Sequence, residues 1–407
     1  MIKKVKTIDL KMGMYIHDLN VPWLEHGFAR SRFMIQNEEQ IEKILNAGIS
    51  ELYIDTKRGL DATHAITKQE AEAASMDKLM DIASGAINEA VADRFDEKKW
   101  VESRQIHTEA VKVIANVMHD ARIGKQVNVE QATPMVVNIT DAILGNDGTL
   151  VSLCRIKQRD SYTFQHCVSV SALLVTFCNS IGGFSENNLI EIGLGGLFHD
   201  IGKMKIPGQI LNKPGSLTEA EFAIMRTHVT EGVDYLRAGR SFNEATLKIV
   251  AEHHERFDGT GYPKRISRNA ISLLGQMTSI VDVYDAITSV RCYHTALEPP
   301  DALQRMFEWS GKHFDETLMH QFIKAIGIYP VGSLVRLKSG RLAVTIRQGE
   351  KSLLQPLVRV VYDAWHGCRL PPTDVDLASR ACQDQIVGYE SSSKWGINPI
   401  EFIGKSV

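Results

Sequence analysis

The dipeptide His199-Asp200 constrains this chain more than any other feature of its sequence. A carboxylate has two oxygens and can bridge two metal ions, while the neighbouring imidazole binds one of them. The same part of the chain carries further side chains of the metal-ligand type, namely His166, His228, His253, His254 and Asp282. A fold for this chain must therefore bring together residues that lie far apart in the sequence.

Together these side chains supply more ligands than one ion takes. A single catalytic metal binds about three protein ligands and keeps one position open for water. The set of imidazoles and carboxylates therefore fits two ions that share a carboxylate. Two ions about 4 Å apart hold a hydroxide between them and a phosphate opposite it, as in-line attack on a phosphodiester requires. We expect a binuclear site that hydrolyses phosphodiesters.

Each histidine taken alone has a simpler explanation. A lone histidine on an apolar helix, such as His166 after Phe164, is more often a hydrogen-bonded core residue than a ligand. The adjacent pair His253-His254 is harder to explain by packing, because neighbouring helical residues point about 100° apart. Both rings reach one cluster only near a helix end, and Gly259 predicts that this helix soon stops.

Two basic residues beside the series complete a phosphate site. Lys203 follows His199 by one helical turn, and Arg291 follows Asp282 along the chain. If both face the cavity, they stabilise the negative charge of a pentavalent transition state. The alternative is a solvated helix end, in which case neither residue contacts a phosphate.

The composition is that of an ordinary globular protein. The chain has 407 residues, 44% of them hydrophobic and 23% charged, which allows two or three domains. A net charge of -3 argues against a general DNA-binding or RNA-binding function. The six cysteines are scattered singly, so neither a zinc knuckle nor a disulfide framework is expected. We recognise no signal peptide and no run suited to membrane insertion, and we expect a cytoplasmic protein.

Hydrophobic periodicity predicts a mainly α fold with β structure at both ends. Residues 1–126 form an N-terminal module, in which residues 1–62 read as a small α/β part and residues 68–119 as two long helices. Residues 127–330 are dense in helices, and residues 331–407 read as a β-rich C-terminal extension that starts with a hairpin.

Local signals refine these boundaries. The two long helices either form a dimerising stalk or pack into the core of the next domain. A polar segment that ends at Pro134 predicts the boundary between the two parts. Ser216 and Glu219 predict a capping box at the start of the helix that carries His228.

The motifs around the donor series resemble the HD-GYP family of bacterial cyclic di-GMP phosphodiesterases. Gly261-Tyr262-Pro263 is the triplet that gives the family its name. The similarity extends over about residues 127–345, and its matching segments are residues 199–203, 206–207, 213–215, 253–263 and 282–293.

This resemblance implies an all-helical HD core that hydrolyses cyclic di-GMP to linear pGpG, and often on to GMP. The seven donors would be the ligands of two divalent ions, usually non-haem iron or manganese. Asp200 would be the bridge and, with Lys203, a catalytic residue. Lys203 and Arg291 would also contact the scissile phosphate, and the Gly261-Tyr262-Pro263 loop would lie near the substrate.

Two positions depart from the family pattern. Members with a third metal carry a glutamate one helical turn before the first histidine, where this chain has Tyr162, so we expect two ions. His294 stands where the family often has a basic residue that binds substrate. Because an unperturbed histidine is mostly neutral near pH 7, this contact with phosphate would be weaker here.

Residues 1–126 resemble, more loosely, an uncharacterised module found upstream of HD-GYP domains, with either a regulatory or a dimerising role. Two alternative functions stay open. One is a catalytically weak module that binds the cyclic dinucleotide or a diguanylate cyclase (GGDEF) protein. The other is a phosphodiesterase that acts on a mixed-base cyclic dinucleotide.

Overall fold

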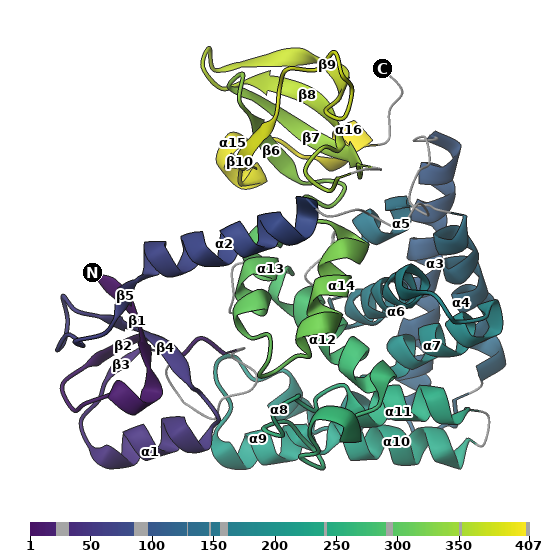
Figure 1. The fold of residues 1–407 in the computed structure, drawn as a ribbon. Helices are drawn as coiled ribbons and strands as arrows, with labels where there is room; N and C mark the ends of the chain where they lie inside the picture. The colour runs from purple at the N-terminus through teal and green to yellow at the C-terminus, as the bar shows by residue number, and fades with distance from the viewer. Residues whose placement is uncertain are drawn as a thin grey trace.

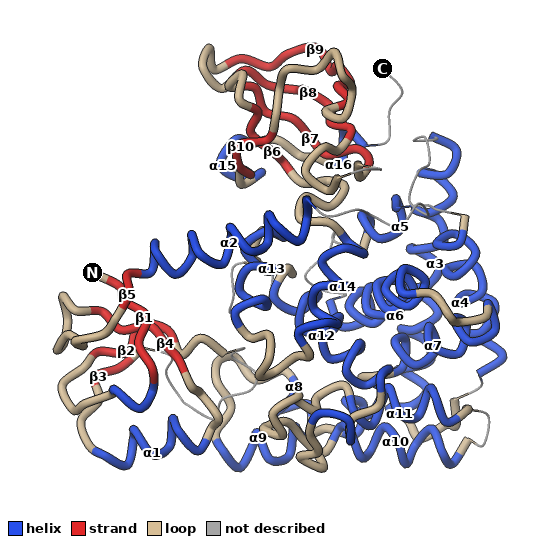
Figure 2. Tube along the Cα trace, in the orientation of Figure 1, coloured by secondary structure: helices blue, strands red, loops and turns tan. Residues whose placement is uncertain are grey.

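The computed structural model describes residues 1–21, 32–84, 97–127, 129–145, 148–154, 162–239, 242–289, 296–349 and 352–403. Figure 1 shows a small sheet-containing part at the N-terminus, a helical part, and a second sheet near the C-terminus. Figure 2 shows that the strands lie in these two outer parts and that the middle of the chain is helical. The predicted fold class is confirmed.

The N-terminal part is a five-stranded antiparallel sheet with the strand order β3-β2-β4-β1-β5. One helix, α1 (Glu38–Asn46), connects β3 to β4, and the side chain of Asn37 caps it by accepting the Gln40 N–H at 3.0 Å. The strands are β1 (Ile2–Lys6), β2 (Tyr15–Asp18), β3 (Phe33–Met34), β4 (Glu51–Asp55) and β5 (Ile66–Thr67).

Two long helices follow, α2 (Lys68–Ser84) and α3 (Glu97–Arg122). Leu79 on α2 and both Ile114 and Met118 on α3 are buried in the same hydrophobic core as the helical domain. These helices therefore pack into the core of the next domain and do not form a separate stalk.

The helical domain surrounds α6 (Tyr162–Ile181), and most of the side chains of this helix are buried. By length and composition α6 is apolar enough to cross a membrane, but 72% of its apolar window is buried inside the fold, as in the central helix of a globular domain. The remaining elements are α4 (Val129–Leu144), α5 (Gly148–Leu153), α6 (Tyr162–Ile181), α7 (Glu186–Phe198), η3 (Ile201–Lys205), α8 (Gly208–Leu211), α9 (Glu219–Arg226), α10 (His228–Ala238), α11 (Glu244–Glu252), α12 (Leu273–Ile287), α13 (Pro299–Glu308) and α14 (Glu316–Ile326).

The C-terminal part is a second antiparallel sheet, in the order β10-β6-β7-β8-β9. The predicted hairpin and third strand are confirmed as β6 (Leu334–Leu337), β7 (Arg341–Arg347) and β8 (Leu357–Asp363). The elements that the sequence did not reveal are β9 (Cys368–Asp376), β10 (Ile386–Tyr389), α15 (Ser392–Trp395) and α16 (Ile400–Ile403).

One local prediction was wrong. The capping box is formed by Thr218 and Glu221, not by Ser216 and Glu219, and the helix that it starts ends at Arg226, before His228. The Lys213 ammonium, 2.5 Å from the Glu221 carboxylate, favours this later start.

Pro134, at the end of the polar segment predicted to contain the boundary, lies inside α4. The buried residues Val136, Ile139 and Ile143 continue the helical period beyond it, and their burial offsets the hydrogen bond that proline removes. The limits of the three predicted parts, 1–126, 127–330 and 331–407, stay predictions.

Candidate metal centre

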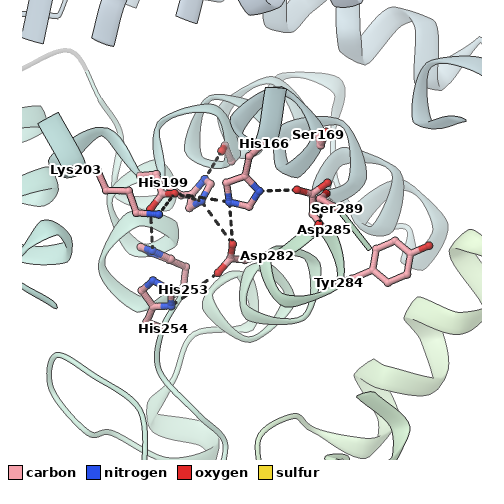
Figure 3. Close-up of polar contacts among 12 residues, drawn as sticks. His166, Ser169, His199, Lys203, His253, His254, Asp282, Tyr284, Asp285 and Ser289 are labelled. Atoms are coloured by element: carbon pink, nitrogen blue, oxygen red, sulfur yellow. Dashed lines mark hydrogen bonds and ion pairs between the residues drawn. The ribbon is translucent and has the colours of Figure 1, made fainter. Parts of the chain in front are cut away.

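The seven predicted donors converge at the centre of the helical domain. The structure arranges them in two groups, and within each group the potential ligand atoms all lie within 4.8 Å of one another. We call His166, His199 and Asp282 the three-donor group, and Asp200, His228, His253 and His254 the four-donor group. Figure 3 shows the imidazoles and Asp282 pointing toward one another from different helices.

Three of the histidines lie at or just after helix ends, and each ring caps the helix before it. His199 follows α7, His228 follows α9, and His253 follows α11. Their Nδ1 atoms meet carbonyl oxygens in the last turns of those helices, namely those of Gly196, Met225 and Val250, at 2.8, 2.7 and 2.9 Å. A carbonyl only accepts hydrogen bonds, so each Nδ1 carries the proton and each Nε2 presents a lone pair.

These lone pairs face one another. The Nε2 atoms of His228 and His253 are 3.4 Å apart, and neither can donate to the other in this tautomer. Among the described residues, buried atoms without a hydrogen-bond partner include His199 Nε2, Asp200 Oδ1 and His254 Nδ1. A cluster of converging lone pairs is unfavourable unless a cation lies among them, so the donor set fits bound metal.

Asp200 lies between the two groups and faces each with a different oxygen. Its Oδ2 is 3.3 Å from His199 Nε2 and 3.7 Å from His166 Nε2. Its Oδ1 is 3.4 Å from His228 Nε2 and 3.9 Å from His253 Nε2. This is the placement that a carboxylate needs to bridge two ions.

The protonation states also suit a metal. Burial lowers the pKa of His228 to about 4 and that of His253 to about 3, so both rings are neutral at neutral pH. Burial by itself would raise the pKa of Asp200, but the Lys203 ammonium holds it well below its usual range. Neutral imidazoles beside an ionised carboxylate are the forms that bind metal ions.

His166 is oriented by Asp285, a residue that the sequence analysis missed. Its Nδ1 is 2.5 Å from Asp285 Oδ2, which leaves Nε2 toward Asp282 Oδ1 at 3.1 Å (Figure 3). Asp285 lies three residues after Asp282 on α12, so both carboxylates share one helix face. That spacing was the signal that could have identified it.

Tyr162 stacks on His166, with ring centroids 5.9 Å apart and an angle of 10° between the rings. It occupies the position where the family's three-metal members carry a glutamate, and a phenol ring in this orientation packs against the ligand. The number of ions is therefore still expected to be two.

A close helix contact explains the glycine after the His-Asp pair. A Cβ atom on Gly202 would lie 1.9 Å from the carbonyl oxygen of His228 and 2.5 Å from the backbone N of Gly232. Only glycine allows η3 to lie this close to α10. The contact brings Asp200 and His228 into the same group.

The Gly261-Tyr262-Pro263 triplet packs behind the metal centre. A Cβ on Gly261 would lie 2.5 Å from the His254 carbonyl oxygen, so the loop crosses the backbone of His254 closely. The Tyr262 N–H donates to that oxygen at 3.1 Å, and the Tyr262 ring lies 4.6 Å from the His254 ring. The loop thus supports a donor, and its predicted contact with substrate stays a prediction.

Of the residues predicted to bind phosphate, the structure describes Lys203. The Lys203 ammonium is 2.5 Å from Asp200 Oδ2 and its side chain is 24% exposed, so it lies at the open edge of the centre (Figure 3). Arg291 and His294 lie outside the described residues.

Comparisons with known proteins agree with this geometry. The "HD domain" family matches residues 153–318, and the "Domain of unknown function (DUF3391)" family matches residues 2–132. The cyclic di-GMP phosphodiesterase PA4108 of Pseudomonas aeruginosa is 36% identical over 402 residues, which cover 98% of this chain and 95% of that protein. The chain belongs to the HD-GYP family.

Other relatives match a smaller share of the chain. The 3'3'-cGAMP-specific phosphodiesterase 2 of Vibrio cholerae is 36% identical over 143 residues, covering 35% of this chain and 27% of that protein. Among solved structures, the HD-GYP-like protein Bd1817 of Bdellovibrio bacteriovorus aligns with a TM-score of 0.47 and 16% identity, covering 79% of this chain and 98% of that one. Membership of this family identifies the chain as a phosphodiesterase with an HD hydrolase domain.

Proposed function

We propose that this protein hydrolyses cyclic di-GMP to linear pGpG, which is itself a phosphodiester and can be cleaved further to GMP. The observation that supports it most is the position of Asp200, whose Oδ2 faces the three-donor group and whose Oδ1 faces the four-donor group. The near full-length similarity to PA4108 supports the choice of substrate.

The seven donors would hold two divalent cations. When bound, these ions supply Lewis acidity and an activated water for cleavage of the phosphodiester. Asp200 would connect the two sites, and His166 would keep its Nε2 available because Asp285 holds its Nδ1 at 2.5 Å.

Lys203 would bind the scissile phosphate. Its ammonium lies beside Asp200, and the side chain is partly exposed. The ammonium can therefore also donate a hydrogen bond to an incoming phosphate oxygen. A positive charge held there neutralises the charge that develops on phosphate oxygens during attack. Arg291, His294 and the Gly261-Tyr262-Pro263 loop are proposed as further contacts to the substrate.

The donor set favours iron or manganese. It combines imidazoles with carboxylates and contains no thiolate, which argues against soft metals. Cys167 lies beside His166 in sequence, but it belongs to neither group of converging donor atoms.

The test is hydrolysis by protein purified without oxygen and loaded with iron(II) or manganese(II), with products separated by chromatography. His199→Ala and Asp200→Ala should abolish formation of pGpG, while His366→Ala, which changes a largely exposed histidine far from the site, should not. Turnover that persists in both site variants would contradict the proposal.

A second candidate substrate is a mixed-base cyclic dinucleotide, because a Vibrio relative is named as specific for 3'3'-cGAMP. Both substrates present the same phosphodiester, so the metal centre does not distinguish them. The ratio of kcat/KM for cyclic di-GMP and 3'3'-cGAMP decides between them. A catalytically weak binding module would instead bind the dinucleotide when loaded with metal and release no product.

The remaining proposals concern the cellular location and the partners of the enzyme. We place it in the cytoplasm, without membrane insertion or nucleic-acid binding, because its substrate would be a bacterial second messenger and α6 is a buried core helix. A homodimer and a diguanylate cyclase (GGDEF) protein are the proposed partners. Size-exclusion chromatography with light scattering tests the first, and co-purification with such a cyclase tests the second.

A further inference from the structure

The N-terminal module docks on α13 through buried charge. The Glu308 carboxylate, 5% exposed, accepts from Lys4 Nζ at 3.0 Å and from Tyr53 O–H at 3.1 Å. Both Asp18 oxygens lie 2.8 Å from Arg305 Nη2. A buried carboxylate left without its partners is strongly destabilising, so these contacts fix the module on the helical domain.

One turn of the docked module reaches the loop that contains Gly261-Tyr262-Pro263. Gly48, between α1 and β4, has a φ of +73°, and a Cβ built on it would lie 2.4 Å from Thr260 Cγ2. A small cavity separates the two parts, lined by Ala47 and Ile49 on one side and by His254 and Tyr262 on the other. The turn at residues 46–49 therefore lies directly behind a donor of the four-donor group.

The chain from Thr260 to His254 is short and tightly bonded. The Thr260 hydroxyl donates to Asp258 Oδ1 at 2.6 Å, which fixes the loop beside the module. The next residue, Gly261, crosses the His254 backbone, and Tyr262 donates to the His254 carbonyl at 3.1 Å. A shift of Thr260 would therefore move the backbone and ring of His254.

The three-donor group has no such dependence. His166 lies in the second turn of α6 and Asp282 in the interior of α12, both helices are packed in the core, and Asp285 holds the His166 ring. A disturbance at the module would reach the two groups unequally.

We propose that the turn at residues 46–49 of the N-terminal module positions His254, so that the module controls how tightly the ion of the four-donor group is held. This inference rests on the ligand set proposed above. Gly48 and Thr260 are positioning residues, because they act through His254 and touch no donor atom. A signal that displaces the module would release one ion and leave the other.

The test changes the contact at Gly48 and uses a matched glycine as the control. Gly48→Ala introduces a Cβ that collides with the Thr260 methyl group, as well as strain at positive φ. Gly124→Ala introduces comparable strain at φ +83°, but its Cβ would meet no atom within 4 Å. Adding Thr260→Ser to Gly48→Ala removes the colliding methyl group and keeps the hydroxyl that bonds Asp258.

The readout is the release of each ion into a chelator from metal-loaded protein, with ions per chain counted before and after. We expect Gly48→Ala to release one ion about tenfold faster than Gly124→Ala, with the second ion unchanged, and Thr260→Ser to restore slow release. If Gly48→Ala does not fold, Thr260→Ser is measured alone. In a chain that keeps Gly48, this change removes the methyl group that contacts the turn and adds no strain, so it should accelerate release of the same ion.

Equal rates of ion release from Gly48→Ala and Gly124→Ala overturn the inference. Where Thr260→Ser alone is used, a release rate equal to that of wild type overturns it as well. Equal loss of both ions, or failure of Thr260→Ser to rescue, also overturns it. Wild-type protein that binds no ions contradicts the proposed function itself, so the two failures are distinguishable.

Discussion

The two donor groups are built in different ways. In the three-donor group, His166 and Asp282 lie on the buried helices α6 and α12, His199 follows the end of α7, and a second carboxylate orients His166. In the four-donor group, His228 begins a helix, while His253 and His254 follow the end of another. The first group has two of its three donors on packed helices, whereas all three histidines of the second lie at helix ends with a loop behind them.

This difference separates what is fixed from what can be adjusted. Donors inside packed helices move only if the core moves, because protein interiors are close-packed. Donors at helix ends move with the adjacent loop. The loop after His254 contacts the N-terminal module through Thr260. The comparison predicts that ligand changes in the two groups have separable effects, except at the residue that they share.

The largest effect is expected where the groups meet. Asp200→Ala removes the carboxylate that faces both groups, and it should reduce kcat/KM by about a thousandfold or more and lower the affinity for both ions. Asp77→Ala, which changes an exposed residue on α2, should leave both quantities unchanged. Elemental analysis and product chromatography check this, and one ion that stays tightly bound without Asp200 would contradict a shared bridge.

A smaller loss is expected when charge is removed beside the centre but every donor is kept. Lys203→Met preserves the apolar stem and should reduce kcat/KM by about a hundredfold while both ions stay bound. Lys205→Met on the same short helix, whose ammonium lies over the Tyr235 ring, is the matched control. Normal kcat/KM in Lys203→Met would show that this lysine does not act on the phosphate.

The three-donor group can be weakened alone through the partner of His166. Asp285→Asn replaces the carboxylate with a neutral amide, and the affinity for one ion should fall by about ten- to a hundredfold. The ion of the four-donor group should keep its affinity. Metal titration of this variant and of the exposed-site control Asp234→Asn measures both steps. Equal weakening of both ions would mean that the groups are not separable.

The smallest effect concerns the pH dependence of stability behind the four-donor group. Burial lowers the pKa of His313 to about 4, below the value of about 6.5 in an unfolded chain, so the folded state binds fewer protons between these values. His313 therefore stabilises the fold fully above pH 6.5, and this contribution is lost as the pH falls toward 4.

His313→Asn should reduce the loss of stability between pH 7.5 and 5.5 by about 1 kcal/mol relative to wild type. Denaturant unfolding at the two pH values measures it, with His366→Asn, at a largely exposed position, as the control. An unchanged pH dependence in His313→Asn would show that this ring keeps its ordinary pKa in the fold.

The sequence identified the candidate donors but not the neighbouring residues that hold them in position. The histidines and aspartates stood out because several residues of ligand type occur between His166 and Asp282. Asp285 was missed, because its spacing of three residues from Asp282 gains a meaning only when the helix is placed beside His166. The contact between Gly48 and Thr260 joins distant segments, and only the tertiary structure brings them together.

Prediction of the fold failed where local pattern and tertiary structure disagree. Strand β9 contains Pro371 and Pro372 and is mostly exposed, which obscures a strand signal, yet it lies at the edge of its sheet, where proline is tolerated. Pro134 is likewise tolerated inside α4, because burial of the later residues of that helix offsets the hydrogen bond that proline removes. Periodicity identified the elements that alternate clearly, such as β6 and β7.

The most direct test of a binuclear phosphodiesterase counts metal and product in one sample. Protein purified without oxygen and loaded with iron(II) or manganese(II) should contain two ions per chain. It should convert cyclic di-GMP to pGpG in proportion to the fraction of chains that hold both ions. Full turnover by chains that hold one ion or none, or no turnover by chains that hold two, would contradict the account.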